Sequence, residues 1–130
     1  MPHESERRRA PRVQVKRLTA LYHPRFDPRD VLHAQPAHKA VAADLSERGL
    51  RVVVRTPLDP GVKLALTLEV PALRLELVLK GDVVRCVEIP AKSGSEPTWA
   101  LGIVLTHAGA DFHELIDRMR TNPRLRLGGI

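Results

Sequence analysis

The 130-residue sequence predicts a small all-β domain, an antiparallel barrel or sandwich, followed by one helix. Apolar and polar side chains alternate with a period of two through most of the chain, and near residue 109 the pattern changes to that of an amphipathic helix. The apolar fraction of 43% suffices for one domain with a single core. Aromatic residues make up only 3%, so we expect this core to be aliphatic.

Six segments have the composition of strands and are separated by turn-forming residues. The clearest is "VKLALTLEV", residues 62–70, in which every second side chain from Val62 to Val70 is aliphatic and Pro71 follows. The same alternation continues through residues 73–89, where Gly81 predicts a bulge or a bend. The remaining predicted strands are residues 12–23, 39–46, 49–56 and 98–107.

The predicted helix lies in "GADFHELIDRMRTNP", residues 109–123. Asp111 and Glu114 resemble a capping box, and Pro123 would stop the helix. Spacing of i, i+3, i+4 and i+7 gives the helix one apolar stripe, formed by Phe112, Leu115, Ile116 and Met119.

These elements divide the chain into a flexible basic arm (residues 1–12), a barrel with its helix (13–122) and a frayed tail (123–130). A long irregular loop with three prolines lies between the first two strands, and the sequence assigns no role to its residues 25–38.

The charge balance favours an anionic partner, because 21 Lys and Arg exceed 15 Asp and Glu by six. Nucleotides, nucleic acid and acidic membrane surfaces all fit this balance. The single cysteine, Cys86, cannot form an internal disulfide, so we expect a reducing, cytoplasmic location. Its apolar neighbours suggest a small buried side chain. We expect no signal peptide, because no apolar region follows the basic N-terminal residues. We also expect no membrane span, because no apolar stretch approaches about 18 residues.

The sequence contains no arrangement typical of an enzyme. The six histidines are scattered without metal-ligand spacing, Ser46 lies in no GxSxG motif, and no pair of carboxylates suggests acid–base catalysis. We therefore expect no catalytic residues, metal or cofactor. Trp99, at the start of the last predicted strand, is expected in the core rather than at a ligand.

Four arginines fall within "ERRRAPR", residues 6–12. In an extended segment, Arg8 and Arg12 would point the same way, about 13 Å apart. A guanidinium is a planar fork that bonds the edge of a guanine, stacks on a base or holds a phosphate. The arginines alone fit a ligand clasp or an ordinary solvated tail.

A second polar motif, "DLSERG", lies between two predicted strands. Ionised Asp44 only accepts hydrogen bonds, so it could pair with the donor edge of a guanine. The hydroxyl of Ser46 could donate to a phosphate or a base, and Gly49 permits a positive φ or a close backbone approach. Taken alone, the motif equally fits an ordinary turn.

Together, the two motifs resemble the signature of the PilZ domain family, which is RxxxR followed by [D/N]xSxxG. Arg8 and Arg12 match the first part, and Asp44, Ser46 and Gly49 match the second. The segments "GVKLALTLEVP", "KGDVVRCVE" and "WALGIVLTH" are similar to later strands of the family, and the resemblance covers roughly residues 6–120.

This resemblance implies a six-stranded antiparallel barrel with a helix at one end that binds cyclic di-GMP, a bacterial second messenger. Arg8 and Arg12 would clasp guanine edges and phosphates. Asp44 and Ser46 would bond a guanine edge and nearby phosphate oxygens, and Gly49 would supply backbone geometry. Arg7 stands just before the RxxxR motif, where an arginine accompanies an intercalated ligand dimer in domains of this kind.

The resulting expectation is a single-domain receptor that changes conformation on ligand binding and signals through an unidentified protein partner. A PilZ-like adaptor that binds no nucleotide is the alternative. Nonspecific nucleic-acid binding is less favoured, because the chain has few aromatic side chains on which bases could stack.

Overall fold

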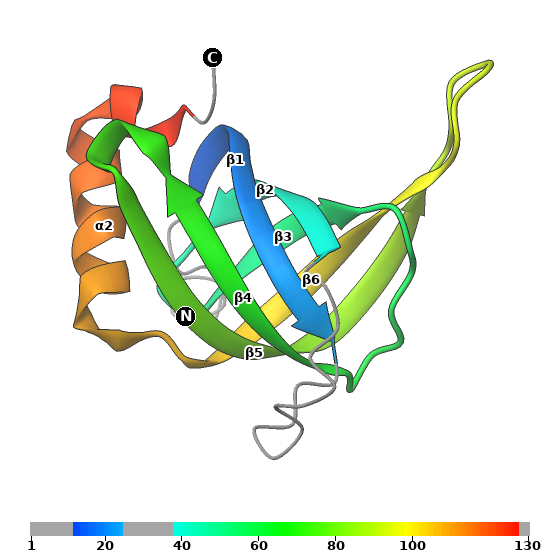
Figure 1. Ribbon diagram of the computed structural model, residues 1–130, viewed down its shortest axis with the longest axis horizontal. Coiled ribbons are helices and arrows are strands. Elements are labelled where there is room, and N and C mark those ends of the chain that lie inside the picture. The colour runs from blue at the N-terminus through cyan, green and yellow to red at the C-terminus, as the bar shows by residue number, and fades with distance from the viewer. Residues whose placement is uncertain (1–11, 25–37, 128–130) are drawn as a thin grey trace, which may run out of the picture.

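In the computed structural model, which describes residues 12–24 and 38–127, the chain forms a closed barrel of antiparallel strands in the order β1-β2-β3-β6-β5-β4 (Figure 1). The prediction of an all-β fold with a six-stranded barrel and a C-terminal helix is confirmed. The strands are β1 (Val13–Pro24), β2 (His38–Leu45), β3 (Gly49–Val54), β4 (Lys63–Val70), β5 (Leu75–Ile89) and β6 (Thr98–His107).

The core is mainly aliphatic, as the low aromatic content predicts, and it also contains Tyr22 and Phe112. In β4, the side chains from Leu64 to Val70 at every second position are buried, and Ala65 on the other face is also nearly covered. The pairing of β5 with β6 shifts register at Gly81, where a Cβ atom would lie 2.6 Å from the carbonyl oxygen of Val104. Gly81 therefore lets two strands approach closely at a register shift, which agrees with the predicted bulge or bend.

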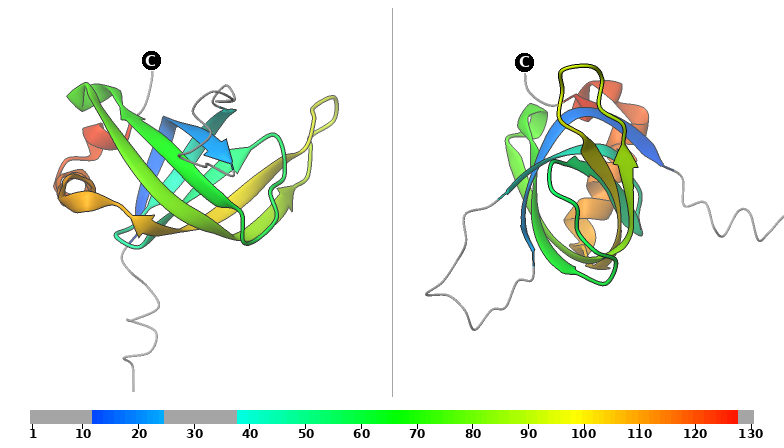
Figure 2. Two further views of the ribbon diagram at one scale, coloured as in Figure 1. Left: turned by 60° about the horizontal axis from the view of Figure 1, so that its bottom comes forward. Right: turned by 90° about the vertical axis from the view of Figure 1, so that its right-hand side faces the viewer.

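Helix α2 (Gly109–Thr121) packs against the barrel near β1 and β5 (Figures 1 and 2). The predicted apolar stripe is confirmed, because its four residues are the buried residues of the helix. The capping box is wrong. The N-cap is Ala108, which makes no side-chain capping bond. Asp111 already lies within the first turn, where its negative charge interacts favourably with the positive end of the helix dipole.

The segment after α2 is more ordered than the predicted frayed tail. Pro123–Arg126 forms a short 3-10 helix, η3, with Leu125 buried, and Arg126 Nε donates a hydrogen bond of 2.7 Å to the carbonyl oxygen of Met119. A bridge between Lys16 and Leu127 joins this segment to β1. One apolar side chain and one arginine thus hold the chain against the barrel as far as residue 127.

The β5–β6 hairpin extends beyond the barrel at the side away from α2 (Figures 1 and 2). Trp99 in this hairpin and Cys86 on β5 are both partly buried and pack against the core, so each is less enclosed than expected. The role of the loop before β2 stays unassigned, since residues 25–37 lie outside the described residues. Among the described helices, none has the length and apolar character needed to cross a membrane.

Candidate functional site

The turn between β2 and β3 holds two of the predicted site residues in a fixed geometry. The Ser46 backbone N–H and hydroxyl both donate to the carbonyl oxygen of Gly49, at 2.8 and 3.2 Å. The N–H of Leu105 donates to the Arg48 carbonyl at 2.9 Å, which ties the turn to β6. A carboxylate–guanidinium distance of 3.6 Å between Glu47 and Arg120 also links it to α2.

Gly49 is required by the close approach of two strands. A Cβ atom at this position would lie 2.3 Å from the carbonyl oxygen of Ile103 on β6, a distance that no real contact tolerates. The positive φ angles among the described glycines lie at Gly61, Gly94 and Gly109. Of the two explanations offered for Gly49, close backbone approach is therefore the correct one.

A β-bulge turns Asp44 toward the outside of the barrel. The register of β2 with β3 passes from Ala42 opposite Val52 to Asp44 opposite Arg51, which leaves Ala43 as an extra residue. Strict alternation would have placed Asp44 on the inward face with Ala42. The bulge instead places it outward, while Leu45, the next residue, is buried in the core.

Asp44 is only 1% exposed because two arginine side chains cover it. Arg12 Nη1 lies 2.7 Å from Oδ1, and Arg51 Nη2 lies 2.9 Å from Oδ2. The arginine side chains remain 60% and 49% exposed, respectively. Both carboxylate oxygens therefore have a cationic partner, which offsets the cost of burying the charge.

Asp44 belongs to a row of outward-facing residues that crosses five strands. Each member pairs with the next across neighbouring strands. We call these residues the polar row: Gln14, Asp44, Arg51, Gly102 and Arg85. Gly102 leaves space between two arginines, since a Cβ atom there would meet only Arg85 Cβ at 3.5 Å and Val84 Cγ2 at 3.9 Å. Arginine forks beside an accepting carboxylate suit an anionic ligand that also has a hydrogen-bonding edge.

The structure brings most of the predicted site residues into one region. Arg12 meets Asp44 directly, and Ser46 and Gly49 form the adjoining turn. Arg7 and Arg8 lie outside the described residues. Sequence reasoning missed Arg51, although alternation in "GLRVVVRT" places it two residues after Gly49 and so on the same face of β3.

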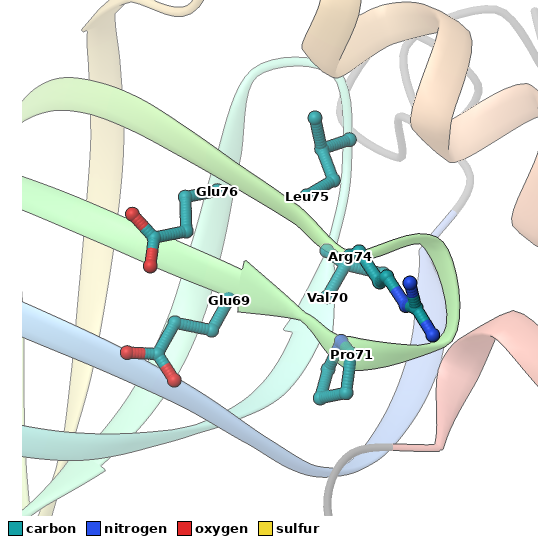
Figure 3. A pocket seen from close by; sticks show the side chains of 6 residues that line it. All are labelled: Glu69, Val70, Pro71, Arg74, Leu75 and Glu76. Carbon is teal, nitrogen blue, oxygen red and sulfur yellow. The ribbon is translucent and has the colours of Figure 1, made fainter.

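A surface hollow of about 510 Å³ lies elsewhere, around the connection between β4 and β5 (Figure 3). Glu69 and Glu76 are opposite each other on the two strands, and their carboxylates extend to the same side, away from Arg74 (Figure 3). Two neighbouring negative charges would repel phosphates. This hollow is therefore a poor site for an anionic ligand.

The chain matches a known protein family over most of its length. The sequence profile of the PilZ domain matches residues 6–120, a span that includes both motifs and all six strands. The chain belongs to the PilZ domain family. Comparison with curated proteins gave no match.

Among solved structures, the PilZ domain of YcgR from Escherichia coli, solved with c-di-GMP, has a similar fold. The TM-score is 0.66 at 14% sequence identity, and the similarity covers 91% of this chain and 92% of the other. At this identity, the similarity shows that the two PilZ domains share the barrel architecture.

Proposed function

We propose that this PilZ domain is a receptor for cyclic di-GMP, which binds on the polar row and the adjoining β2–β3 turn. The observation that carries the proposal is the 2.7 Å ion pair between Arg12 and Asp44. These residues are 32 positions apart, and they belong to the two halves of the family signature. The c-di-GMP in the YcgR domain, which has the same fold, supports this assignment.

The ion pair also suggests how the ligand changes the conformation. A guanine presents N1–H and N2–H₂ donors, and Asp44 can accept from both only through its two oxygens. In the structure these oxygens bond Arg12 and Arg51. Because Asp44 is only 1% exposed beneath these side chains, a guanine that reaches its carboxylate would displace at least one arginine. Arg12 is the candidate, since it precedes β1 and its side chain is the more exposed of the two.

The other signature residues complete the proposed site. Arg8 and the displaced Arg12 would bond guanine edges and phosphates, while Ser46 would turn its hydroxyl from Gly49 toward the ligand. Gly49 keeps β3 close to β6 and so fixes the turn. Arg51 would remain beside Asp44 and hold its carboxylate in place.

We further propose that two ligand molecules bind as an intercalated pair, because position 7 is arginine. A second molecule adds two phosphate charges next to the first. An additional planar cation offsets this repulsion and can stack on the outer base.

The proposed output is a conformational signal passed to a protein partner in the bacterial cytoplasm, without catalysis by this domain. Displacement of Arg12 would alter the surface around the β2–β3 turn, which the ion pair of Glu47 with Arg120 links to α2. A partner that contacts this surface would sense the ligand.

Isothermal titration calorimetry with cyclic di-GMP and cyclic di-AMP tests the proposal. We expect micromolar affinity for cyclic di-GMP, about −8 kcal/mol, and much weaker binding of cyclic di-AMP, whose bases present a different edge. Absence of heat at hundreds of micromolar ligand would favour the nucleotide-independent adaptor. Equal affinities would reject the guanine-reading role of Asp44.

The same titration tests the stoichiometry. The wild type should bind two molecules per domain, and Arg7→Leu should bind one. A wild-type ratio near one would reject the ligand pair, and a ratio of two in Arg7→Leu would show that Arg7 does not admit the second molecule.

A further inference from the structure

A second row of outward-facing residues lies directly beside the polar row, and it is apolar. Cross-strand pairing joins Val41 on β2 to Val53 on β3, then to Ala100 on β6 and to Val87 on β5. We call these four residues the apolar row. It measures about 14 Å along the sheet, given the usual spacing of strands.

The apolar row is unusual for the outside of a barrel. Outward faces of antiparallel sheets are normally polar, as in β4, where Lys63, Thr67 and Glu69 alternate with the buried leucines. By contrast, Val41 is 48% exposed and Val87 is 51% exposed. Contiguous apolar surface of this kind commonly marks a site of protein interaction.

Cations border the apolar row on both sides. On one side lie Arg51 and Arg85 of the polar row, which precede Val53 and Val87 by two residues on the same face of β3 and β5. On the opposite side, Lys39 precedes Val41 by two residues and Arg55 follows Val53 by two residues; both are exposed. An aliphatic strip with two cations on each side has a clear complement, namely an aliphatic segment bordered by carboxylates.

A hollow gives one end of the row additional depth. It has a volume of about 640 Å³, and its lining includes Val41, Val53, Lys39 and Arg55. An aliphatic side chain of a partner could enter this hollow between the two cations, which would bury more apolar area than contact with the flat sheet alone.

We infer that the apolar row and its bordering cations form a docking surface for an acidic, aliphatic-rich protein segment. The inference rests on the proposed function for the existence of a signalling partner and deepens it by naming the partner's chemistry. Nucleotide bound on the polar row would lie beside the docked segment, because Arg51 and Arg85 border both surfaces.

The observations favour a protein segment over an anionic membrane. The side chains of the apolar row are short and aliphatic, and they lie on a regular strand surface. Membrane-surface proteins insert bulky side chains such as Trp, Phe and Leu below the headgroups. Valine and alanine on a sheet cannot reach that depth, whereas they can pack against another protein surface.

The test is a selection from a phage-displayed library of random 16-residue peptides on the wild-type protein without nucleotide. We expect enriched peptides to combine aliphatic side chains with carboxylates on both sides of them. An enriched peptide is then synthesised, and its affinity is measured by fluorescence anisotropy. It should bind Val87→Glu at least tenfold more weakly than the wild type.

Val78→Glu is the matched control. Val78 is 64% exposed on the same strand, but it lies opposite Thr67 of β4, outside the apolar row. The enriched peptide should bind this variant within twofold of the wild type. Thermal melts of both variants check that each is folded at the temperature of the binding measurement.

Several outcomes would overturn the inference. These are a selection without enrichment, enriched peptides rich in basic residues, and unchanged binding by Val87→Glu. Co-sedimentation with phosphatidylglycerol vesicles that Val87→Glu abolishes would reassign the surface to a membrane. A dimer in sedimentation velocity that Val87→Glu dissociates would reassign it to a second copy of the chain. Since nucleotide is absent, failure here leaves the calorimetric test of cyclic di-GMP binding unaffected.

Discussion

Leu66 in the barrel interior and Asp44 on its outer face are both 1% exposed, but they are buried in different ways. Leu66 is enclosed by the strands of the barrel, so its burial depends on the whole fold. Asp44 is covered by Arg12 and Arg51, whose side chains are themselves 60% and 49% exposed. Burial in the interior therefore supports stability, whereas burial at Asp44 can be reversed by moving one side chain, as a ligand site requires.

The largest effect on stability should come from the interior. Leu66→Ala should lower the free energy of unfolding by about 2–5 kcal/mol, because it leaves a cavity among packed aliphatic side chains. Urea denaturation measures this change. Val78→Ala is the control, and it should change stability by less than about 0.5 kcal/mol since Val78 is exposed. Similar losses in the two variants would contradict the assigned core.

Gly49→Ala should have the next largest effect, about 1–3 kcal/mol of stability, because the new methyl group would meet the backbone of Ile103. Gly102→Ala makes a matched comparison on the opposing strand, where the added Cβ has ordinary van der Waals contacts. We expect it to remain within about 1 kcal/mol of the wild type. If thermal melts show a larger loss of stability in Gly102→Ala than in Gly49→Ala, the inferred close approach of β3 to β6 at Gly49 is contradicted.

The arginines around Asp44 should contribute little to stability individually. Arg51→Ala should cost less than about 1 kcal/mol, because its side chain is half exposed and Arg12 still pairs with the carboxylate. Removing both arginines should cost about 0.5–3 kcal/mol more than the sum of the single changes, since Asp44 then has neither cation. A double-mutant cycle by urea denaturation measures this coupling, and strict additivity would show that the two arginines do not share Asp44.

Much of the fold follows from local pattern. The alternation in residues 62–70 and the stripe from Phe112 to Met119 each depend on neighbouring residues, so the sequence predicts both. The capping box failed because the helix begins at Gly109, two residues before Asp111. The tail was misjudged because its order depends on tertiary contacts: Leu125 is buried, and Lys16 of β1 forms a bridge with Leu127.

The candidate site was harder to predict because its geometry depends on register. The family resemblance identified Arg12, Asp44, Ser46 and Gly49, but simple alternation would point Asp44 into the core. Only the extra residue at Ala43 turns it outward, and nothing in "KAVAADLS" indicates a bulge. The role of Arg51 and the existence of the apolar row follow from that same register.

The most direct test of the central claim compares ligand binding and stability in Arg12→Ala. The claim is that Arg12 and Asp44 form a ligand site on the outer face rather than part of the fold. Calorimetry with cyclic di-GMP should show a loss of about 2–4 kcal/mol in binding free energy, because a charge-assisted contact is removed. The melting temperature should stay within about 3 °C of the wild type. Unchanged affinity, or a large fall in melting temperature, would contradict the claim.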